Sequence, residues 1–256
     1  MSNNNNNDST MKTALVLGAT GAVGKQLLKD LLKNGPYAKV VTVGRRNVEL
    51  DNTVPQDKLV QNTVNFDNLE ASRQVFRDVD DVYCCLGTTR KDAGSAEQFR
   101  KIDQDYVVNS AKMIVEENPT KTTTTFKSPV HFLYCSSMGA NKDSYLLYPQ
   151  SKGQTEDRIS RAGFEKVSIF RPGALETVEP RPQYRPAEAF IGSFFFKVNS
   201  MLNLHMGISV LDVGRSMRLA ATSPSSVPAN VKSTTKIIDG TNVNIFTNKD
   251  MDNMKV

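Results

Sequence analysis

The stretch Thr13-Ala-Leu-Val-Leu-Gly-Ala-Thr-Gly-Ala-Val-Gly24 decides the fold of this chain. It opens with an apolar run, residues 13–17, of the kind that forms a buried β-strand. Glycines then recur at three-residue intervals from Gly18 to Gly24. Apolar side chains follow at helical spacing through residues 23–32. The chain therefore begins with a strand, a glycine turn and a helix.

Strands and helices continue to alternate downstream. We expect further strands near residues 39–43, 60–66, 81–86, 130–135 and 167–170, and helices near residues 69–76, 96–117 and 148–161. Such alternation produces a parallel sheet with helices on both faces, connected by right-handed crossovers. The sequence thus predicts an α/β fold, a Rossmann-type doubly wound parallel sheet, over residues 11–170.

The two ends of the chain differ from this pattern. Residues 1–10 are Asn-rich with nothing apolar to bury, which predicts a disordered tail. Residues 171–256 predict a small C-terminal lobe, packed on the sheet and able to hold a substrate or partner. Inside the lobe we expect an amphipathic stretch at 190–206, a helix near 212–221 and a strand near 236–238. The amphipathic stretch could face a membrane or partner, but packing in the lobe is the preferred interpretation.

Composition excludes several classes of protein. The net charge of +5 comes from 32 basic and 27 acidic residues that are interspersed, which indicates an ordinary solvated surface and no nucleic-acid partner. No apolar run approaches the roughly 20 residues of a membrane-spanning helix. The N-terminus lacks the features of a secretory signal or a transit peptide, so we expect a cytoplasmic location.

The cysteines and histidines do not indicate a metal site. Cys84, Cys85 and Cys135 lie in apolar runs and are expected to be core thiols in a reducing compartment. His131 lies in an apolar strand, so we expect a core residue whose hydrogen bonds are satisfied. His205 stands alone near the end of the amphipathic stretch.

The glycine turn is suited to a phosphate ligand. Gly18, Gly21 and Gly24 stand between a strand and a helix, where residues without a Cβ let backbone N–H groups approach a pyrophosphate. A plain structural turn is the alternative, but the flanking strand and helix favour a dinucleotide. The remaining residues expected to line the phosphates are Thr20, Ala22 and Val23.

Two arginines follow the second strand, where NAD-binding proteins place an acidic residue. Arg45 and Arg46 can hold the 2′-phosphate of NADPH through charge-assisted hydrogen bonds, although solvated loop arginines are the alternative. Asp67, just past the third strand, is a candidate contact to the adenine amino group, or a turn-forming Asp. The predicted cofactor is therefore NADPH.

A reactive set follows the fifth strand. Tyr148 and Lys152, four residues apart, lie on one face of a helix. A free phenol titrates near pH 10, so a neighbouring ammonium is needed to favour its reactive form. The pair could also be a surface pair, but a strand ending in Ser136-Ser137 precedes it, and ligands bind at this edge of a parallel sheet. A serine there can polarise a carbonyl, and we prefer Ser137 over Ser136.

These motifs together resemble the Tat-interacting protein family of atypical short-chain dehydrogenases/reductases. The resemblance spans about residues 11–217 and rests on GATGAVG, the double arginine, CCLGTTR (84–90), the Ser-Ser strand end, YPQSK (148–152) and FRPGAL (170–175). It implies NADPH binding on a Rossmann fold, oxidoreductase activity, and protein partners such as nuclear-import receptors.

The resemblance also implies roles for single residues. Tyr148 would be the proton acceptor, with Lys152 beside it. The remaining residues expected near the cofactor by resemblance are Leu86, Gly87, Thr88, Leu175 and Arg185. One position departs from the common pattern, because Asp103 stands where many short-chain dehydrogenases have an asparagine that holds a relay water.

The sequence leaves more than one function open. The favoured hypothesis is an NADPH-dependent oxidoreductase that transfers a hydride to a small-molecule carbonyl substrate, with Tyr148 as proton donor. The alternative is an NADPH-sensing regulatory protein with little turnover. An epimerase or dehydratase is disfavoured, because the C-terminal lobe looks too short for a nucleotide-sugar pocket.

Overall fold

The structure is a computed structural model that describes residues 11–120, 126–178, 206–223, 228 and 230–254. The expected N-terminal tail lies outside the described residues, as does the amphipathic stretch apart from Met206. Arg185 and His205 also lie outside them.

A single large sheet forms the centre of the molecule, confirming the predicted Rossmann-type fold. Its strands run in the order β3-β2-β1-β4-β5-β6-β10-β9. All neighbours are parallel except β10 and β9, which are antiparallel. The strands are β1 (Thr13–Leu17), β2 (Lys39–Gly44), β3 (Leu59–Thr63), β4 (Asp81–Cys84), β5 (Ser128–Cys135), β6 (Phe164–Arg171), β9 (Thr234–Ile238) and β10 (Thr241–Thr247).

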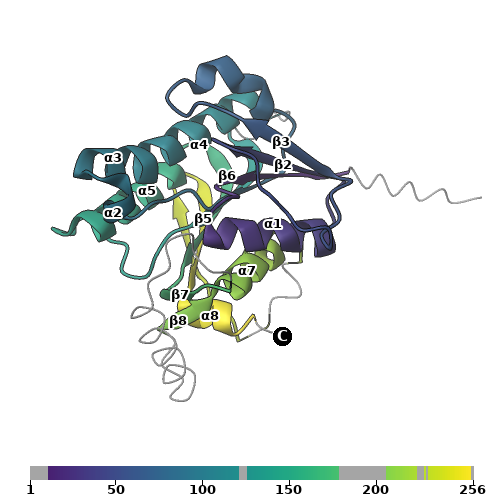
Figure 1. The fold of residues 1–256 in the computed structure, drawn as a ribbon. Coiled ribbons are helices and arrows are strands. Elements are labelled where there is room, and N and C mark those ends of the chain that lie inside the picture. Colours follow the sequence, from purple (N-terminus) through teal and green to yellow (C-terminus); the bar gives the residue numbers. More distant parts are fainter. Residues whose placement is uncertain (1–10, 121–125, 179–205, 224–227, 229, 255–256) are drawn as a thin grey trace, which may run out of the picture.

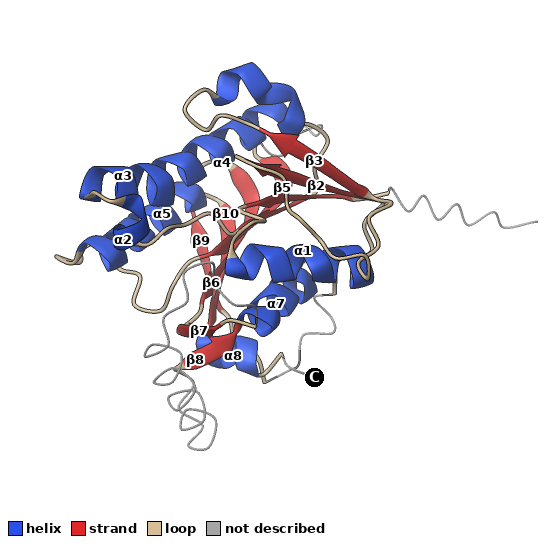
Figure 2. Ribbon diagram, in the orientation of Figure 1, coloured by secondary structure: helices blue, strands red, loops and turns tan. Residues whose placement is uncertain are grey.

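Helices cover both faces of the sheet, as Figures 1 and 2 show. One face carries α1 (Ala22–Asn34), α7 (Val210–Thr222) and α8 (Asn248–Asp252); the other carries a 3-10 helix (Leu69–Phe76), α4 (Tyr106–Glu117) and α5 (Leu147–Ser160). Strand side chains alternate between these layers. In β1, Leu15 and Leu17 join the core under α4, whereas Ala14 and Val16 join the core under α1.

Helices α1 and α7 approach each other closely at one glycine. A Cβ added to Gly214 of α7 would lie 3.0 Å from the backbone of Leu27 in α1. Because Leu27 is completely buried, this contact sets how closely α7 can pack on α1, the first helix of the chain. Arg218 reinforces the contact through an ion pair of 2.6 Å with Asp30.

The long helix predicted for residues 96–117 is interrupted. A short α2 (Arg90–Ala93) leads into α3 (Ala96–Arg100), a π-helical segment (Lys101–Asp105) and then α4. A π-helical turn inserts one residue into the helical repeat, and such segments are frequent at functional sites. Here the segment buries Asp103 and Gln104.

The chain after Arg171 contributes more to the sheet than the sequence predicts. One strand is expected there, but β9 and β10 form a hairpin in which β10 pairs with β6. The turn is Asp239-Gly240, whose φ angles of 48° and 76° suit a two-residue hairpin. A separate pair of short parallel strands, β7 (Ala174–Glu176) and β8 (Gly207–Ser209), lies beside α7 and α8.

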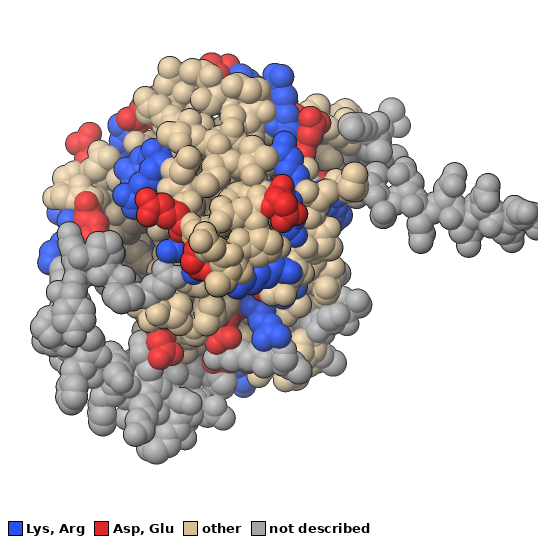
Figure 3. All heavy atoms as spheres, turned by 45° about the vertical axis from the view of Figure 1, so that its right-hand side comes forward, with Lys and Arg blue, Asp and Glu red and all other residues tan. Residues whose placement is uncertain are grey.

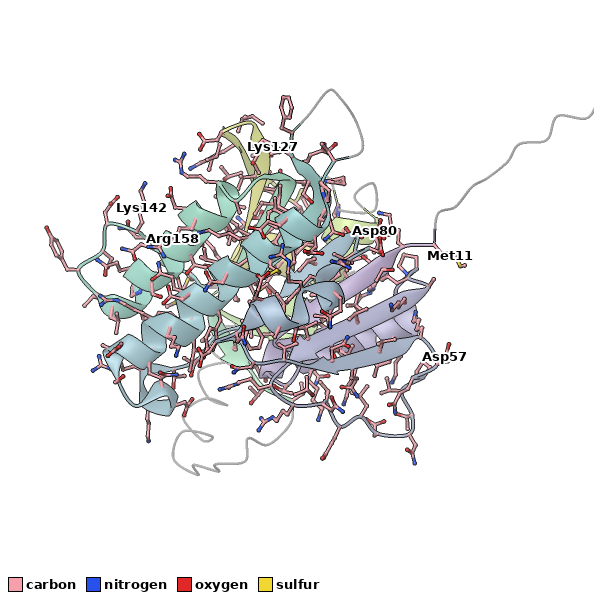
Figure 4. All side chains as sticks on the ribbon, turned by 90° about the horizontal axis from the view of Figure 1, so that it is seen from above. Met11, Asp57, Asp80, Lys127, Lys142 and Arg158 are labelled. Carbon is pink, nitrogen blue, oxygen red and sulfur yellow. The ribbon has the colours of Figure 1, made fainter. Side chains whose placement is uncertain are left out.

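Buried polar groups gather at the amino end of the sheet, where Asp81 and His131 lie near Asp80, a residue labelled in Figure 4. His131 of β5 shares a 2.9 Å hydrogen bond between Nε2 and Ser168 Oγ, and its Nδ1 lies 3.6 Å from Asp81 Oδ1. The Tyr37 hydroxyl donates to Asp81 at 2.9 Å. The prediction that His131 is a satisfied core residue is therefore confirmed.

The neutral imidazole of His131 makes stability depend on pH. Burial lowers its pKa, although Asp81 opposes this shift. Protons therefore favour the unfolded chain, so this contribution to stability is complete above the unfolded pKa of about 6.5 and is lost as pH falls through it toward the lower folded pKa. We expect urea titrations between about pH 8 and pH 5 to show this loss, with a smaller loss in His131→Asn.

A matched control is His205→Asn, which removes the other of the chain's 2 histidines. The same pH dependence in wild type and His131→Asn would contradict the assignment.

Candidate functional site

A cleft of about 500 Å³ opens at the carboxyl ends of β1, β2 and β4. Strand β1 lies between β2 and β4, so the chain leaves it in opposite directions along the sheet at this point. Ligands of doubly wound sheets bind at such switch points. Residues predicted from the sequence that line the cleft are Gly18, Thr20, Gly21, Arg45, Arg46, Leu86 and Gly87.

The glycine turn is held by backbone contacts that exclude side chains. Gly18 has a φ of +80°, and a Cβ there would lie 2.6 Å from the carbonyl carbon of Cys85. A Cβ on Gly24 would lie 2.2 Å from the Gly18 carbonyl oxygen. Gly21 N–H donates to that same oxygen at 3.0 Å. The turn therefore packs β1 against both the start of α1 and the end of β4.

The start of α1 fits an anionic ligand. Its N-cap is Gly21, which has no side chain to cap the helix, and the first turn contains no acidic residue. The first N–H groups of a helix lack intrahelical partners and carry partial positive charge, so they suit a pyrophosphate. Ala22 and Val23 stand in this first turn, where Val23 directs its side chain into the core and offers its backbone to a ligand.

The two arginines follow β2 at the mouth of the cleft. Arg45 and Arg46 are exposed, and neither forms an ion pair with a carboxylate in the part of the chain that the structure describes. Basic and acidic side chains are otherwise interspersed on the face shown in Figure 3. Two guanidiniums that line the cleft without a carboxylate partner among the described residues fit a second anionic group.

Asp67 lies in a neighbouring hollow of about 660 Å³, not in the cleft lining. Its Oδ1 accepts from the Tyr106 hydroxyl at 2.9 Å and pairs with Lys101 Nζ at 2.9 Å. These contacts, that of Lys101 first, lower the pKa of Asp67. The two cavities share Phe66 and Tyr106, whose rings stack with centroids 5.1 Å apart. Asp67 therefore supports an aromatic wall of the cleft.

Tyr148 and Lys152 begin α5 in contrasting surroundings. The Tyr148 side chain is 44% exposed, whereas Lys152 is only 4% exposed. Lys152 Nζ lies 6.0 Å from the centroid of the Tyr148 ring. The phenol is thus open to an incoming molecule while the ammonium is buried beneath it.

Buried partners hold Lys152. Its Nζ forms a 2.9 Å ion pair with Asp103 Oδ1 and donates to the Tyr134 hydroxyl at 3.2 Å. Burial alone would lower the pKa of Lys152, but the oxygens of Tyr134 and Asp103 outweigh it and raise the pKa well above its usual value. A Cβ on Gly87 would lie 3.3 Å from Nζ, so the cleft wall touches the ammonium.

The two serines at the end of β5 differ in their partners. Ser136 Oγ donates to Glu156 Oε1 at 2.6 Å, and Arg171 binds the same carboxylate through two nitrogens at 2.9 and 2.5 Å. Ser137 Oγ is buried and has no hydrogen-bond partner among the described residues. Ser136 is therefore committed to a structural network, and Ser137 is available.

Thr88 and Leu175, two further predicted residues, do not line the cleft, and the same holds for Tyr148, Lys152, Ser136 and Ser137. Thr88 is half-buried after β4, and its hydroxyl donates to the carbonyl of Thr89 at 3.4 Å. Leu175, in β7, packs partly against the core under α1 and α7. Arg185 falls in the part of the chain that the structure does not describe.

Sequence reasoning missed parts of this site. The cleft also contains Thr42, Val48, Phe66, Ile102 and Tyr106, whose residue types carry no signature of ligand binding. The carboxylate partner of Lys152 could have been expected from the sequence, because a lysine on a buried helix face requires a nearby carboxylate. The structure identifies this partner as Asp103. The glycine cradle, the two arginines and the adjoining Tyr-Lys pair define a dinucleotide-binding Rossmann protein.

Comparison with known proteins agrees with this class. Residues 18–192 match a protein-family model described as NAD(P)H-binding. Protein HTATIP2 of Rattus norvegicus is 34% identical over 84% of this chain and 83% of its own length. The mitochondrial protein FMP52 of Candida albicans is 36% identical over 64% of this chain and 67% of its own length.

Solved structures show the same fold. A short chain dehydrogenase family protein from Francisella tularensis has a TM-score of 0.60 at 12% identity, covering 94% of this chain and 99% of that one. The Bordetella bronchiseptica enzyme WbmF in complex with NAD+ has a TM-score of 0.58 at 14% identity, covering 82% and 69%.

This chain belongs to the NAD(P)H-binding Tat-interacting protein family of atypical short-chain dehydrogenases/reductases, which confirms the resemblance seen in its sequence. It is a Rossmann protein that takes a nicotinamide cofactor. None of the described helices is long and apolar enough to cross a membrane. The FMP52 relative is named as mitochondrial, so the cytoplasmic location stays a prediction.

Alanine substitutions at two glycines distinguish the cost of backbone strain from the cost of a close contact in the glycine turn. Gly18 and Gly94 both have a φ of +80°, but a Cβ on Gly94 would meet nothing within 4 Å. We expect Gly94→Ala to lower the free energy of unfolding by about 1–2 kcal/mol, from strain alone. Gly18→Ala should cost about 1–3 kcal/mol more, because the methyl group displaces the Cys85 backbone.

Urea unfolding of both variants measures this difference. Equal losses would show that the contact with Cys85 does not limit the turn.

Proposed function

We propose that this chain is an NADPH-dependent oxidoreductase that reduces a small-molecule carbonyl compound, with Tyr148 as the proton donor. The observation that carries the proposal is the position of Gly87. Gly87 lines the cleft, and a Cβ there would lie 3.3 Å from Lys152 Nζ. The end of the cleft at Gly87 therefore lies next to Lys152, one member of the Tyr-Lys pair.

The chain's own residues divide the binding of NADPH among them. The glycine turn and the start of α1 bind the pyrophosphate, and Arg45 and Arg46 bind the 2′-phosphate. Asp67 uses Oδ1 for both of its contacts, which leaves Oδ2 for the adenine amino group. The other proposed cofactor contacts are Leu86, Gly87, Thr88, Lys152, Leu175 and Arg185. When bound, the nicotinamide supplies a hydride.

The reacting end combines one open phenol with two buried groups. Tyr148 donates its proton to the carbonyl oxygen, and its exposure allows a substrate to reach it. Lys152 holds the nicotinamide ribose and keeps a positive charge next to the phenol. Ser137 donates a hydrogen bond to the same carbonyl, a role supported by its buried and unpartnered hydroxyl.

Cofactor preference tests the double arginine. We expect NADPH to bind at least tenfold more tightly than NADH, a difference of about 1.4 kcal/mol. Arg45→Ala/Arg46→Ala should remove the preference, because NADH lacks the 2′-phosphate that the guanidiniums bind. Fluorescence titration with both cofactors measures the two affinities.

The control for this experiment is Lys142→Ala/Arg158→Ala, which removes two positive charges from surface ion pairs beside α5 (Figure 4). This variant should keep the preference for NADPH. Equal affinity of the wild type for both cofactors would refute the role of the arginines.

Substitutions of Tyr148 and Lys152 should affect the reaction rate and the affinity for NADPH differently. Tyr148→Phe should lose about 10²- to 10⁴-fold in rate and keep its affinity for NADPH, because it removes only the proton donor. Lys152→Ala should lose both rate and affinity, because the lysine also binds the ribose. A panel of aldehydes and ketones gives the rates, and calorimetry with NADPH gives the affinities.

Two results would contradict this division of roles: weakened NADPH binding in Tyr148→Phe, or full activity in that variant. If the wild type binds NADPH but turns over no carbonyl compound, the chain serves instead as an NADPH-sensing regulatory protein.

A further inference from the structure

Asp103 is a completely buried carboxylate that the proposed chemistry does not use. Its side chain is 0% exposed, and its Oδ1 lies 2.9 Å from Lys152 Nζ. Its Oδ2 accepts a hydrogen bond from Ser151 Oγ at 3.2 Å. Burial of a charged carboxylate is costly unless a charged partner and hydrogen bonds satisfy it. Both oxygens of Asp103 therefore face α5.

The π-helical segment explains how Asp103 reaches this position. Next to it, Gln104 Nε2 donates to Gln154 Oε1 of α5 at 3.1 Å, so two consecutive residues of the segment contact that helix. Asp105, two residues beyond Asp103, is exposed and lies 3.9 Å from Arg158. The local change in helical repeat thus directs one carboxylate inward and leaves the next one at the surface.

Asp103 is the group that supplies negative charge to Lys152. The other titratable groups facing Nζ are the Tyr134 phenol of β5, the Cys84 thiol of β4 and the Tyr148 phenol one helical turn earlier. Burial raises the pKa of Tyr134 above its usual value and that of Cys84 to about 12, so both groups are neutral at physiological pH. The thiols of Cys85 and Cys135 pack on the opposite face of the sheet, but they also interact electrostatically with Lys152.

We propose that Asp103 is the positioning residue of Lys152: it holds the ammonium in its charged form between the cleft wall at Gly87 and the ring of Tyr148. This inference rests on the proposed function, in which Lys152 binds the ribose and keeps a positive charge next to the Tyr148 phenol. Tyr134 contributes a hydrogen bond to the lysine and Asp103 contributes the charge. Without Asp103, the dry surroundings of Nζ favour the neutral amine, which binds the ribose less strongly and no longer supports the phenol.

The first test measures the titration of Lys152 directly, without cofactor or substrate. Competitive acylation with acetic anhydride across a pH series, followed by peptide mass spectrometry, gives the pH at which each lysine becomes reactive. In Asp103→Asn, which keeps the shape of the side chain but removes its charge, the midpoint for Lys152 should fall to about pH 8 or lower. Asp105→Asn, the matched surface control, should leave the midpoint of Lys152 unchanged.

The second test uses the affinity for NADPH as a function of pH. At about pH 6 we expect Asp103→Asn to bind NADPH within about threefold of the wild type, because Lys152 is protonated in both. At about pH 9 we expect its affinity to be at least tenfold weaker than that of the wild type. Recovery at low pH would show a role of charge, since damage to packing would weaken binding at every pH.

A third variant keeps the proposal testable if Asp103→Asn does not fold. Tyr134→Phe removes the hydrogen bond to Nζ and retains the carboxylate, so the labelling midpoint of Lys152 should stay within about half a pH unit of the wild type. A larger fall would assign the control of charge to Tyr134 and overturn the proposal.

The results distinguish this proposal from the proposed function. An unchanged Lys152 midpoint in Asp103→Asn, or a loss of NADPH affinity that is equal at all pH values, would overturn the role of Asp103. Failure of the wild type to bind NADPH would refute the proposed function alone, because the labelling experiment needs no cofactor.

Discussion

The contact between the Gly18 turn and the end of β4 is the constraint on which the rest of the structure depends. A side chain at Gly18 would overlap the backbone of Cys85, and one at Gly24 would overlap the carbonyl of Gly18. Three elements, β1, α1 and β4, therefore meet within a single turn. Because β4 continues directly into Leu86 and Gly87, the same contact also sets the wall of the cleft that touches Lys152.

The sequence predicts the sheet well where local patterns decide the structure. Short apolar runs identify the strands from β1 to β6, because all of them except the partly exposed β3 are largely buried. It misses β10, in which polar residues such as Asn242 and Asn244 alternate with Val243 and Ile245. That alternation and the Asp239-Gly240 turn are hairpin signals, but the parallel pairing of β10 with β6 brings together residues far apart in the chain.

Candidate site residues can be recognised in the sequence where they form a motif typical of one chemistry. The glycines, the two arginines and the Tyr-Lys pair are such motifs. The site is not predictable where partners meet only in the folded chain. The sequence cannot show that Glu156 engages Ser136 and leaves Ser137 without a hydrogen-bond partner among the described residues, because that depends on Arg171 of the next strand. The π-helical segment is equally hidden, since residues 96–117 have the pattern of one ordinary helix.

The two ends of the cleft present positive charge in different physical forms. Arg45 and Arg46 are solvated, so their attraction for a phosphate is weakened by salt and needs little reorganisation of the protein. Lys152 is buried, so its charge is screened much less, but it exists only because Asp103 is buried with it. A solvated pair is suited to capturing a charged ligand from solution. A buried ion pair is suited to holding one geometry, which is what Tyr148 would require of its neighbour in the proposed role of proton donor.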